Sequence, residues 1–368
     1  MSWPGKTAIL GLAVASAACA TATPAASPAA GLHAAAYAVS TGDLDGDGLP
    51  DAREAALAER FAPIVIHSSA ESNLPTDVDL FLESASLWYH DDACRAPDHL
   101  VRATGDQAAL LGHEERSCAD GSVVTSDGSR SLRKRRTFFL PDVDEPGRRG
   151  TTDASRWKTY VHAYPNTRGG VTLQYWRFYT YNRAFASHGG DWEGLHVVLG
   201  ADLKVAELSL LGHRSITAVT PRDVAWEGDH PIIYSEIGGH TSRAKGDEIP
   251  ARGCGDVDLC SVTLDDFHTR IRQETWTGGS VEWSDGRVTR GGGLVNLGEK
   301  SAPLGGQVFI RYSGLWGSPG HFYATSGYWG PAFNETSMRD DGFVAAWCAG
   351  MAGPLDQTRE CFATRAEP

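Results

Sequence analysis

One short stretch of the chain places a histidine, an aspartate and a glutamate within six residues. It reads S-H-G-G-D-W-E-G-L-H-V-V over Ser187–Val198. His188 and the two glycines after it predict a loop that leads into a strand. Because side chains alternate along a strand, Asp191 and Glu193 would share one face and Trp192 would lie on the other. Two carboxylates about 7 Å apart beside an imidazole suit a hard divalent cation or acid/base catalysis. An ordinary turn with solvated carboxylates is the alternative.

A second acidic cluster lies earlier in the chain. The segment Asp43–Glu54 fits the calcium-loop pattern D-x-D-x-D-G-x5-E in full. Gly48 would take the sharp turn, whereas Pro50, where an aliphatic residue is usual, argues against a paired sensor hand. We therefore expect one structural Ca²⁺ site that fixes the start of a helix over Asp51–Arg60. Its predicted ligands are Asp43, Asp45, Asp47, Asp51 and Glu54.

Two further residues have side chains suited to acid/base chemistry. Glu236 ends the apolar run Ile232–Tyr234 and could act as a general acid if burial raised its pKa. His240 follows two glycines. A solvated strand end and a structural histidine are equally good interpretations. The chain has no G-x-S-x-G, H-E-x-x-H or phosphate-loop motif, which argues against serine-hydrolase, zincin and nucleotide-dependent chemistry.

Aromatic residues are numerous, with eleven tryptophans and eleven tyrosines. Such rings can stack on sugars, although most tryptophans in a sheet protein belong to the core. Trp316 and Trp329 lie in glycine-rich segments and are expected to be exposed. The residues predicted to bind substrate are Tyr181, Asn182, Trp192 and Trp316.

The rest of the chain predicts a mostly β fold. Hydrophobic residues make up 41% of the sequence, which is enough for a core, and the net charge of −13 argues against a nucleic-acid partner. Short strands separated by turn residues favour a single β-sandwich domain with long loops over residues 55–368, preceded by the calcium loop (43–54) and its helix. The predicted strands include Trp157–Tyr164, Val171–Tyr181, Gly194–Leu199, Val205–Leu211, Pro231–Glu236, Gly279–Trp283 and Gln307–Tyr312.

The N-terminal residues predict export from the cytoplasm. Residues 1–19 resemble a signal peptide, and the Ala/Pro/Thr/Ser-rich residues 20–42 predict a flexible tether. Cys19 follows small residues as in a bacterial lipoprotein signal, but Ser16 stands where leucine is usual, so membrane anchoring through a lipidated Cys19 and plain cleavage both stay open. The protein is expected to be secreted or anchored to the outer envelope. The other six cysteines allow fifteen pairings, of which spacing favours Cys94–Cys118, Cys254–Cys260 and Cys348–Cys361.

Several motifs together resemble a known family. They are Leu57–Pro63 with Glu71, then H-x-G-D-W-E at His188–Glu193, then Gly238–His240, and finally Gly314–Gly317. This combination resembles the vacuolar protein sorting-associated protein 62 family and its bacterial secreted relatives, most of which have no assigned chemistry.

A more distant similarity links the motif to the necrosis- and ethylene-inducing-like proteins, which carry G-H-R-H-D-W-E on a β-sandwich. That resemblance implies that His188, Asp191 and Glu193 bind a divalent cation, Ca²⁺ or Mg²⁺, needed for cytolysis. The second histidine of that motif falls on Gly190. The upstream acidic ligand has no acidic counterpart, and Asn182 is the nearest oxygen donor.

Three functions follow as hypotheses. The first is a glycoside hydrolase acting on a glucan-type cell-wall or surface polysaccharide, with Asp191, Glu193, Glu236 and His240 as catalytic residues. Two catalytic carboxyl groups would lie about 5–5.5 Å apart for retention or about 6.5–9.5 Å apart for inversion. The second is a non-enzymatic, cation-dependent module that binds a glycan or glycolipid surface and is cytolytic. The third is a structural envelope protein whose one metal is the calcium of the loop.

Overall fold

The computed structural model describes residues 42–129, 136–184, 187–212, 215–246, 269–320 and 326–334. The chain divides into Met1–Val39 and Ser40–Pro368, and the described residues all belong to the second unit. The predicted signal peptide, Cys19 and all but the last residue of the tether lie outside them. The predicted pairs Cys254–Cys260 and Cys348–Cys361 lie outside them too.

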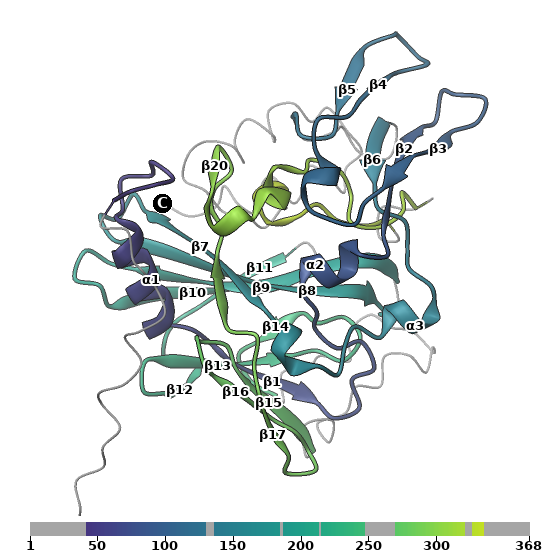
Figure 1. Ribbon diagram of the computed structural model, residues 1–368. Helices are drawn as coiled ribbons and strands as arrows, with labels where there is room; N and C mark the ends of the chain where they lie inside the picture. The colour runs from purple at the N-terminus through teal and green to yellow at the C-terminus, as the bar shows by residue number, and fades with distance from the viewer. Residues whose placement is uncertain are drawn as a thin grey trace, which may run out of the picture. The chain divides into compact units, whose positions relative to one another are not determined.

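A six-stranded sheet runs through the middle of this unit (Figure 1). Its strand order is β11-β10-β9-β8-β7-β18, antiparallel except where β18 pairs parallel with β7. Every residue of the two twelve-residue strands β8 and β9 is buried, so this sheet is covered on both faces. The strands are β7 Thr159–Pro165, β8 Val171–Asn182, β9 His188–Leu199, β10 Val205–Gly212, β11 Ser215–Val219 and β18 Leu294–Asn296.

A second sheet covers one face of the first. Its order is β12-β13-β1-β15-β16-β17, with β14 paired to β13. Leu173 and Leu195 of the central sheet pack with Ile233 of this sheet and with Leu57 and Phe61 of helix α1 (Asp51–Arg60). This core confirms the predicted β-sandwich. The strands are β1 Ile64–Ser68, β12 Ala225–Glu227, β13 His230–Ser235, β14 Ser242–Arg243, β15 Arg270–Glu274, β16 Ser280–Glu282 and β17 Val288–Arg290.

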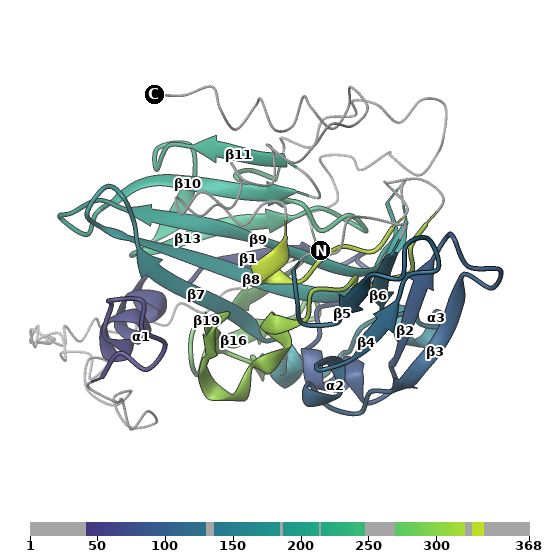
Figure 2. The same cartoon turned by 90° about the horizontal axis from the view of Figure 1, so that it is seen from above.

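Short elements cover the opposite face of the central sheet (Figure 2). There an aromatic core joins Phe178 and Trp192 to Phe81, Phe309 and Trp316. The helical segments are α2 Val78–Leu82, α3 Glu145–Arg148 and the 3₁₀ turns η1 Ala108–Leu110, η2 Ala154–Arg156, η5 Leu304–Gly306, η6 Val308–Arg311 and η8 Pro331–Phe333. The strands are β2 Ser86–Asp91, β3 Asp98–Ala103, β4 Glu114–Arg116, β5 Val123–Thr125, β6 Arg136–Phe139, β19 Gly298–Glu299 and β20 Ala302–Pro303. Among the described helices, none is long and apolar enough to cross a membrane.

Three local expectations from the sequence are wrong. The segment predicted as a strand over Gln307–Tyr312 is mainly the 3₁₀ turn η6, because a short apolar run fits either structure and here Phe309 and Ile310 turn into the aromatic core. His188 lies within strand β9 rather than in a loop. Trp316 and Trp329 are buried, with 0% and 4% of their surface exposed, because their segments pack against the aromatic residues of this layer.

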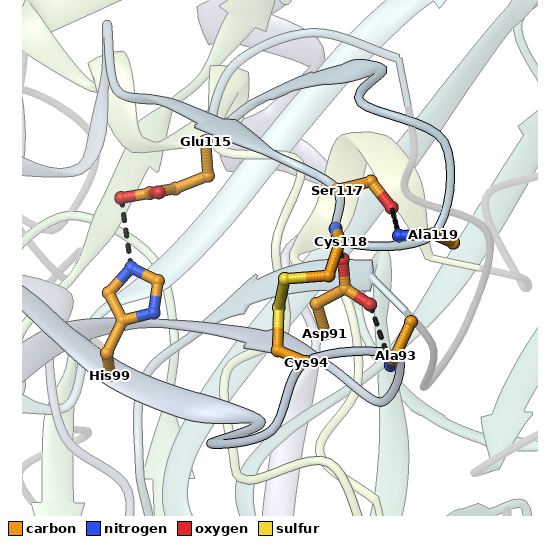
Figure 3. Close-up of a disulfide and its surroundings, with 8 residues drawn as sticks. All are labelled: Asp91, Ala93, Cys94, His99, Glu115, Ser117, Cys118 and Ala119. Carbon is orange, nitrogen blue, oxygen red and sulfur yellow. Dashed lines mark hydrogen bonds and ion pairs between the residues drawn. A yellow bond between two sulfur atoms is a disulfide. The ribbon is translucent and has the colours of Figure 1, made fainter.

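The predicted disulfide between Cys94 and Cys118 is confirmed (Figure 3). It joins the β2–β3 hairpin to the segment between β4 and β5, which extend on the same side of the molecule in Figure 1. The buried Asp91 carboxylate accepts hydrogen bonds from the backbone N–H of Ala93 (2.9 Å) and Cys118 (2.8 Å). His99 and Glu115 add an ion-pair contact of 3.1 Å between the hairpins.

Candidate functional site

The loop before α1 is folded around its own carboxylates. Asp43 accepts backbone hydrogen bonds from Gly46 (2.7 Å), Asp47 (3.2 Å) and Gly48 (2.9 Å). Gly48 has a backbone φ of +93°, a conformation that favours glycine. Asp51, the first residue of α1, accepts from the N–H of Leu44 at 2.9 Å, so the loop closes onto the helix.

Three side-chain oxygens in this loop are buried and have no hydrogen-bond partner among the described residues. They are Asp45 Oδ2, Asp47 Oδ2 and Glu54 Oε1. One ligand atom from each of these three residues lies within 4.8 Å of the others. Such a group of unpaired carboxylate oxygens is unfavourable by itself and suits an oxygen-preferring divalent cation. The donor set therefore fits Ca²⁺ at the positions that the sequence pattern predicts.

The electrostatics of the loop carboxylates agree with this interpretation. Burial, followed by the charges of neighbouring acids, raises the pKa of Asp47 to about 6 and that of Glu54 to about 8. A carboxyl group with a raised pKa is one whose negative charge lacks compensation. A bound divalent cation would supply that compensation and hold both groups ionised.

The D-W-E motif lies on β9, and its side chains alternate as predicted. Trp192 points into the aromatic core, where its ring stacks on that of Phe309 at 5.6 Å. Asp191 and Glu193 lie opposite Tyr179 and Arg177 in the β8–β9 pairing. Tyr179 bonds Ser235 of the second sheet (3.2 Å). The two motif carboxylates therefore face the interior between the sheets, with 1% and 0% of their surface exposed.

Asp191 is held by His240. Asp191 Oδ2 lies 2.7 Å from His240 Nδ1 and accepts a second hydrogen bond from Asn182 Nδ2 at 3.0 Å. The other ring nitrogen of His240 lies 3.7 Å from Glu71 Oε2. The imidazole also stacks on the Tyr179 ring with centroids 3.7 Å apart. His240 thus joins two buried carboxylates.

The protonation state of His240 follows from its neighbours. Burial alone would lower its pKa, but the Glu71 charge and the hydrogen bond to Asp191 outweigh burial and raise the pKa well above the ordinary value. His240 in turn affects the pKa of the Glu71 carboxylate. Burial would raise its pKa, whereas the His240 charge and the backbone N–H of Gly238 and Asn73 lower it. The three groups form an Asp⁻–His⁺–Glu⁻ chain.

The network continues across the sheet interface. Arg177 is 1% exposed, lies opposite Glu193, and donates to Ser242 Oγ at 3.1 Å. His67 of β1 contacts Gln273 Oε1 through Nε2 at 3.2 Å. Burial, followed by the positive charge of Arg177, lowers the pKa of His67 to about 3. Polar side chains from both sheets are therefore paired with one another inside the sandwich.

The predicted cation ligands on β9 have other contacts. His188 is buried and packs against the Tyr328 ring at 4.8 Å, while Asp191 is engaged by His240. His188, Asp191 and Glu193 are not among the groups of described residues whose ligand atoms lie within 4.8 Å of one another. A second cation at this position stays a prediction.

The predicted catalytic residues divide into two groups. Asp191, Glu193 and His240 are within the buried network, where no sugar reaches them in this conformation. Glu236 is separate from their ion pairs, since its carboxylate accepts from Arg243 Nη2 at 2.9 Å. A catalytic pair built from Glu236 and a motif carboxylate stays a prediction.

The predicted sugar-binding residues are largely covered. Trp192 and Trp316 belong to the aromatic core and offer no open ring face. The guanidinium of Arg148 lies over the Tyr181 ring at 4.2 Å. Both polar atoms of the Asn182 side-chain amide are hydrogen-bonded. Nδ2 donates to Asp191 and Gly239, and Oδ1 accepts from the backbone N–H of Ala184. Asn182 therefore positions Asp191.

The sequence did not predict several residues of the loop Asp43–Glu54 site and of the buried network around Asp191. His67 and Arg177 belong to the buried network, and Asn296 Nδ2 donates to Glu54 Oε2 of the loop at 2.6 Å. No local sequence pattern marks these three residues. Glu71 is among the residues on which the family resemblance rests, but the sequence predicted no role for its side chain. A polar residue within an apolar strand, such as His67 after Ile64–Ile66, was the available signal for a buried network.

Comparisons with known proteins leave the family open. No family model matches the chain, and no curated protein matches it. Among solved structures, one described as "Toxin fold for microbial attack and plant defense" overlaps 52% of this chain and 67% of its own chain, at 14% identity and a TM-score of 0.29.

Two other solved structures are of the same group. "NLPPya in complex with glucosamine" covers 56% of this chain and 74% of its own, at 15% identity and a TM-score of 0.30. Necrosis and Ethylene inducing Protein 2 from the causal agent of cocoa's Witches Broom disease covers 50% and 76%, at 14% identity and a TM-score of 0.25. At these TM-scores neither a shared fold nor a shared ligand follows.

Proposed function

We propose that this chain is a calcium-stabilised, non-enzymatic module that binds a glycan outside the cell. The observation that carries the cation part is the set of three buried, unpaired carboxylate oxygens of Asp45, Asp47 and Glu54. The glycan part comes from the resemblance of the His188–Glu193 motif to cation-dependent cytolytic proteins. Export through residues 1–19, with or without a lipid on Cys19, belongs to the same proposal.

The state of the motif carboxylates supports binding over hydrolysis. A general acid must reach the glycosidic oxygen and exchange a proton with it. Asp191 is buried, bonded to Asn182 and ion-paired with His240, and Glu193 is fully buried. We therefore propose a structural role for the motif, in which it holds the two sheets together.

A polysaccharide-retention assay tests the proposal. Purified mature protein would be incubated with insoluble α- and β-glucans, chitin and peptidoglycan, in Ca²⁺ and in chelator. The variant Glu54→Gln removes a cation ligand, and Asp285→Asn, an exposed carboxylate in the β16–β17 turn, is its control. We expect retention on at least one polysaccharide, lost in chelator and in Glu54→Gln and kept in Asp285→Asn.

Reducing-sugar release measured in the same incubations separates binding from hydrolysis. We expect none. Soluble sugar that is released by the wild type and lost in Asp191→Asn would replace the binding proposal with a hydrolase. If no polysaccharide retains the protein, the glycan-binding part of the proposal is wrong. A calcium-stabilised structural protein would then remain.

A further inference from the structure

The last residue of the loop Asp43–Glu54 is hydrogen-bonded to a distant strand. Asn296 Nδ2 donates a hydrogen bond of 2.6 Å to Glu54 Oε2. Asn296 is the last residue of β18, and its Oδ1 accepts from the backbone N–H of Gly298 at 3.2 Å. Because the amide oxygen is engaged by Gly298, the amide nitrogen is directed toward the Glu54 carboxylate. The Asn296 side chain therefore has one fixed orientation.

Strand β18 belongs to the framework against which the loop packs. It pairs in parallel with β7, where Asn296 lies opposite Val161. Leu294 of β18 is in the same hydrophobic core as Leu49 of the loop and Leu57 of α1. Helix α1 contacts β18 and also β7, beside which it lies in Figure 2. Asn296 is therefore held at a defined place relative to the first turn of α1, which contains Glu54.

Glu54 is the loop residue whose side-chain orientation matters most. A glutamate at position 12 of such a loop ordinarily supplies two oxygens to Ca²⁺. Glu54 is 0% exposed, and its Oε1 has no hydrogen-bond partner among the described residues. One of its ligand atoms lies within 4.8 Å of ligand atoms of Asp45 and Asp47. The bond from Asn296 leaves Oε2 able to bind a cation as well, because a carboxylate oxygen has more than one lone pair.

We propose that Asn296 is a positioning residue of the calcium site. It holds the Glu54 carboxylate beside Asp45 and Asp47, and it thereby couples Ca²⁺ binding to strand β18. The inference rests on the calcium site of the proposed function. It adds to that site a residue of the central sheet that acts through Glu54 and does not itself touch the cation.

A fixed Glu54 should bind Ca²⁺ more tightly than a mobile one. A glutamate side chain loses rotamer freedom when it binds a metal, and a hydrogen bond that already restricts the side chain lowers this cost. Removing the hydrogen-bond partner of a metal ligand typically weakens metal affinity about 10–100-fold. Coupling between two sites is reciprocal, so bound Ca²⁺ should in turn stabilise β18.

Calcium titration of Asn296→Ala by calorimetry tests the inference. We expect the Ca²⁺ dissociation constant to rise at least about tenfold relative to the wild type. Val295→Ala is the matched control, because Val295 is in the same strand but packs against the aromatic core on the opposite face of the central sheet. It should lower the melting temperature and leave the dissociation constant unchanged. Asn296→Ser, whose hydroxyl is one bond closer to the backbone than the amide nitrogen, replaces Asn296→Ala if the latter does not fold.

The outcomes separate the positioning role from the calcium site. If the wild type binds no Ca²⁺, the calcium site of the proposed function is wrong. If the wild type binds Ca²⁺ and Asn296→Ala binds it equally well, the site stands and the role of Asn296 is wrong. If Val295→Ala weakens binding as much as Asn296→Ala does, the effect comes from a loosened strand, which also contradicts the role.

Hydrogen exchange gives a second readout of the coupling. In the wild type, saturating Ca²⁺ should slow exchange in residues 42–60 and in residues 294–298. In Asn296→Ala, saturating Ca²⁺ should still protect residues 42–60 but no longer residues 294–298. Equal protection of residues 294–298 in both proteins would contradict coupling through Asn296.

Discussion

His240 Nδ1 lies 2.7 Å from Asp191 Oδ2, and both side chains are almost completely buried. Asp191 comes from β9 of the central sheet. His240 comes from the segment between β13 and β14 of the second sheet, where its backbone φ of +56° is unusual for a residue other than glycine. The aspartate of the D-W-E motif is therefore part of a contact between the two sheets.

Removing this contact should cost stability. Asp191→Asn leaves the His240 imidazolium with Glu71 as its one remaining carboxylate partner among the described residues. We expect the free energy of unfolding to fall by roughly 3–5 kcal/mol, as when one member of a buried ion pair is removed. Urea denaturation measures the change. Asp202→Asn, which breaks an exposed pair with Lys204, should leave the midpoint almost unchanged. Equal midpoints for wild type and Asp191→Asn would contradict a structural role.

Gly190 should not tolerate any side chain. Its backbone φ is +58°, and an added Cβ would collide with the carbonyl oxygen of Trp316. Gly228 has nearly the same φ, +62°, but faces open space. We expect Gly228→Ala to cost about 1–2 kcal/mol from backbone strain and Gly190→Ala to cost more, on the order of 4 kcal/mol. Thermal unfolding of the two variants checks this, and equal losses would show that the collision relaxes.

Mild acid should destabilise the fold through two neutral histidines. Burial lowers the pKa of His196 to about 3, and burial with the Arg177 charge lowers that of His67 to about 3. The unfolded chain takes up these two protons near pH 6.5, whereas the folded chain does not. Stability is therefore full above pH 6.5 and falls as pH drops toward 3, by at most about 1.4 kcal/mol per pH unit for each histidine.

Denaturation midpoints between pH 7 and pH 4 measure this slope. His196→Gln should reduce it, because one of the two titrating groups is gone. His240 acts in the opposite direction, since its pKa is raised: its contribution is complete below pH 6.5 and is lost as pH rises through the raised value. Equal slopes for the wild type and His196→Gln between pH 7 and pH 4 would contradict a neutral His196 in the folded state.

Reduction of the disulfide should loosen the two hairpins and leave the sandwich folded. Cys94 and Cys118 are 24 residues apart, and a bridge closing a loop of that size is worth about 3 kcal/mol through the unfolded state. Hydrogen exchange should rise in residues 91–125 after reduction or in Cys94→Ser/Cys118→Ser. Calcium affinity should not change, because the loop Asp43–Glu54 is stabilised by contacts with α1 and β18. Unchanged hydrogen exchange in the hairpins would show that the Asp91 hydrogen bonds and the His99–Glu115 contact hold the hairpins together without the disulfide.

The sequence by itself determined what depends on local chemistry. The carboxylate spacing and Gly48 specify a loop whose acidic groups could hold a metal ion, and α1 has the predicted bounds Asp51–Arg60. Period-two alternation placed Asp191 and Glu193 on the face opposite Trp192, and spacing gave the Cys94–Cys118 pair. Each of these patterns is complete within a few residues or one hairpin, so no long-range contact was needed to infer it.

Only the tertiary structure decided what those residues contact. The motif suggested a cation or catalytic site on sequence grounds, but its Asp191 is paired with His240 because the second sheet packs on this face. Trp316 is buried because a third layer covers the other face of the central sheet. Asn296 reaches Glu54 of the loop Asp43–Glu54 because β18 pairs in parallel with β7. In each case the environment of a side chain is set by another strand or layer, as for His240, 49 residues from Asp191, and Asn296, 242 residues from Glu54. A pattern of neighbouring residues cannot encode such contacts.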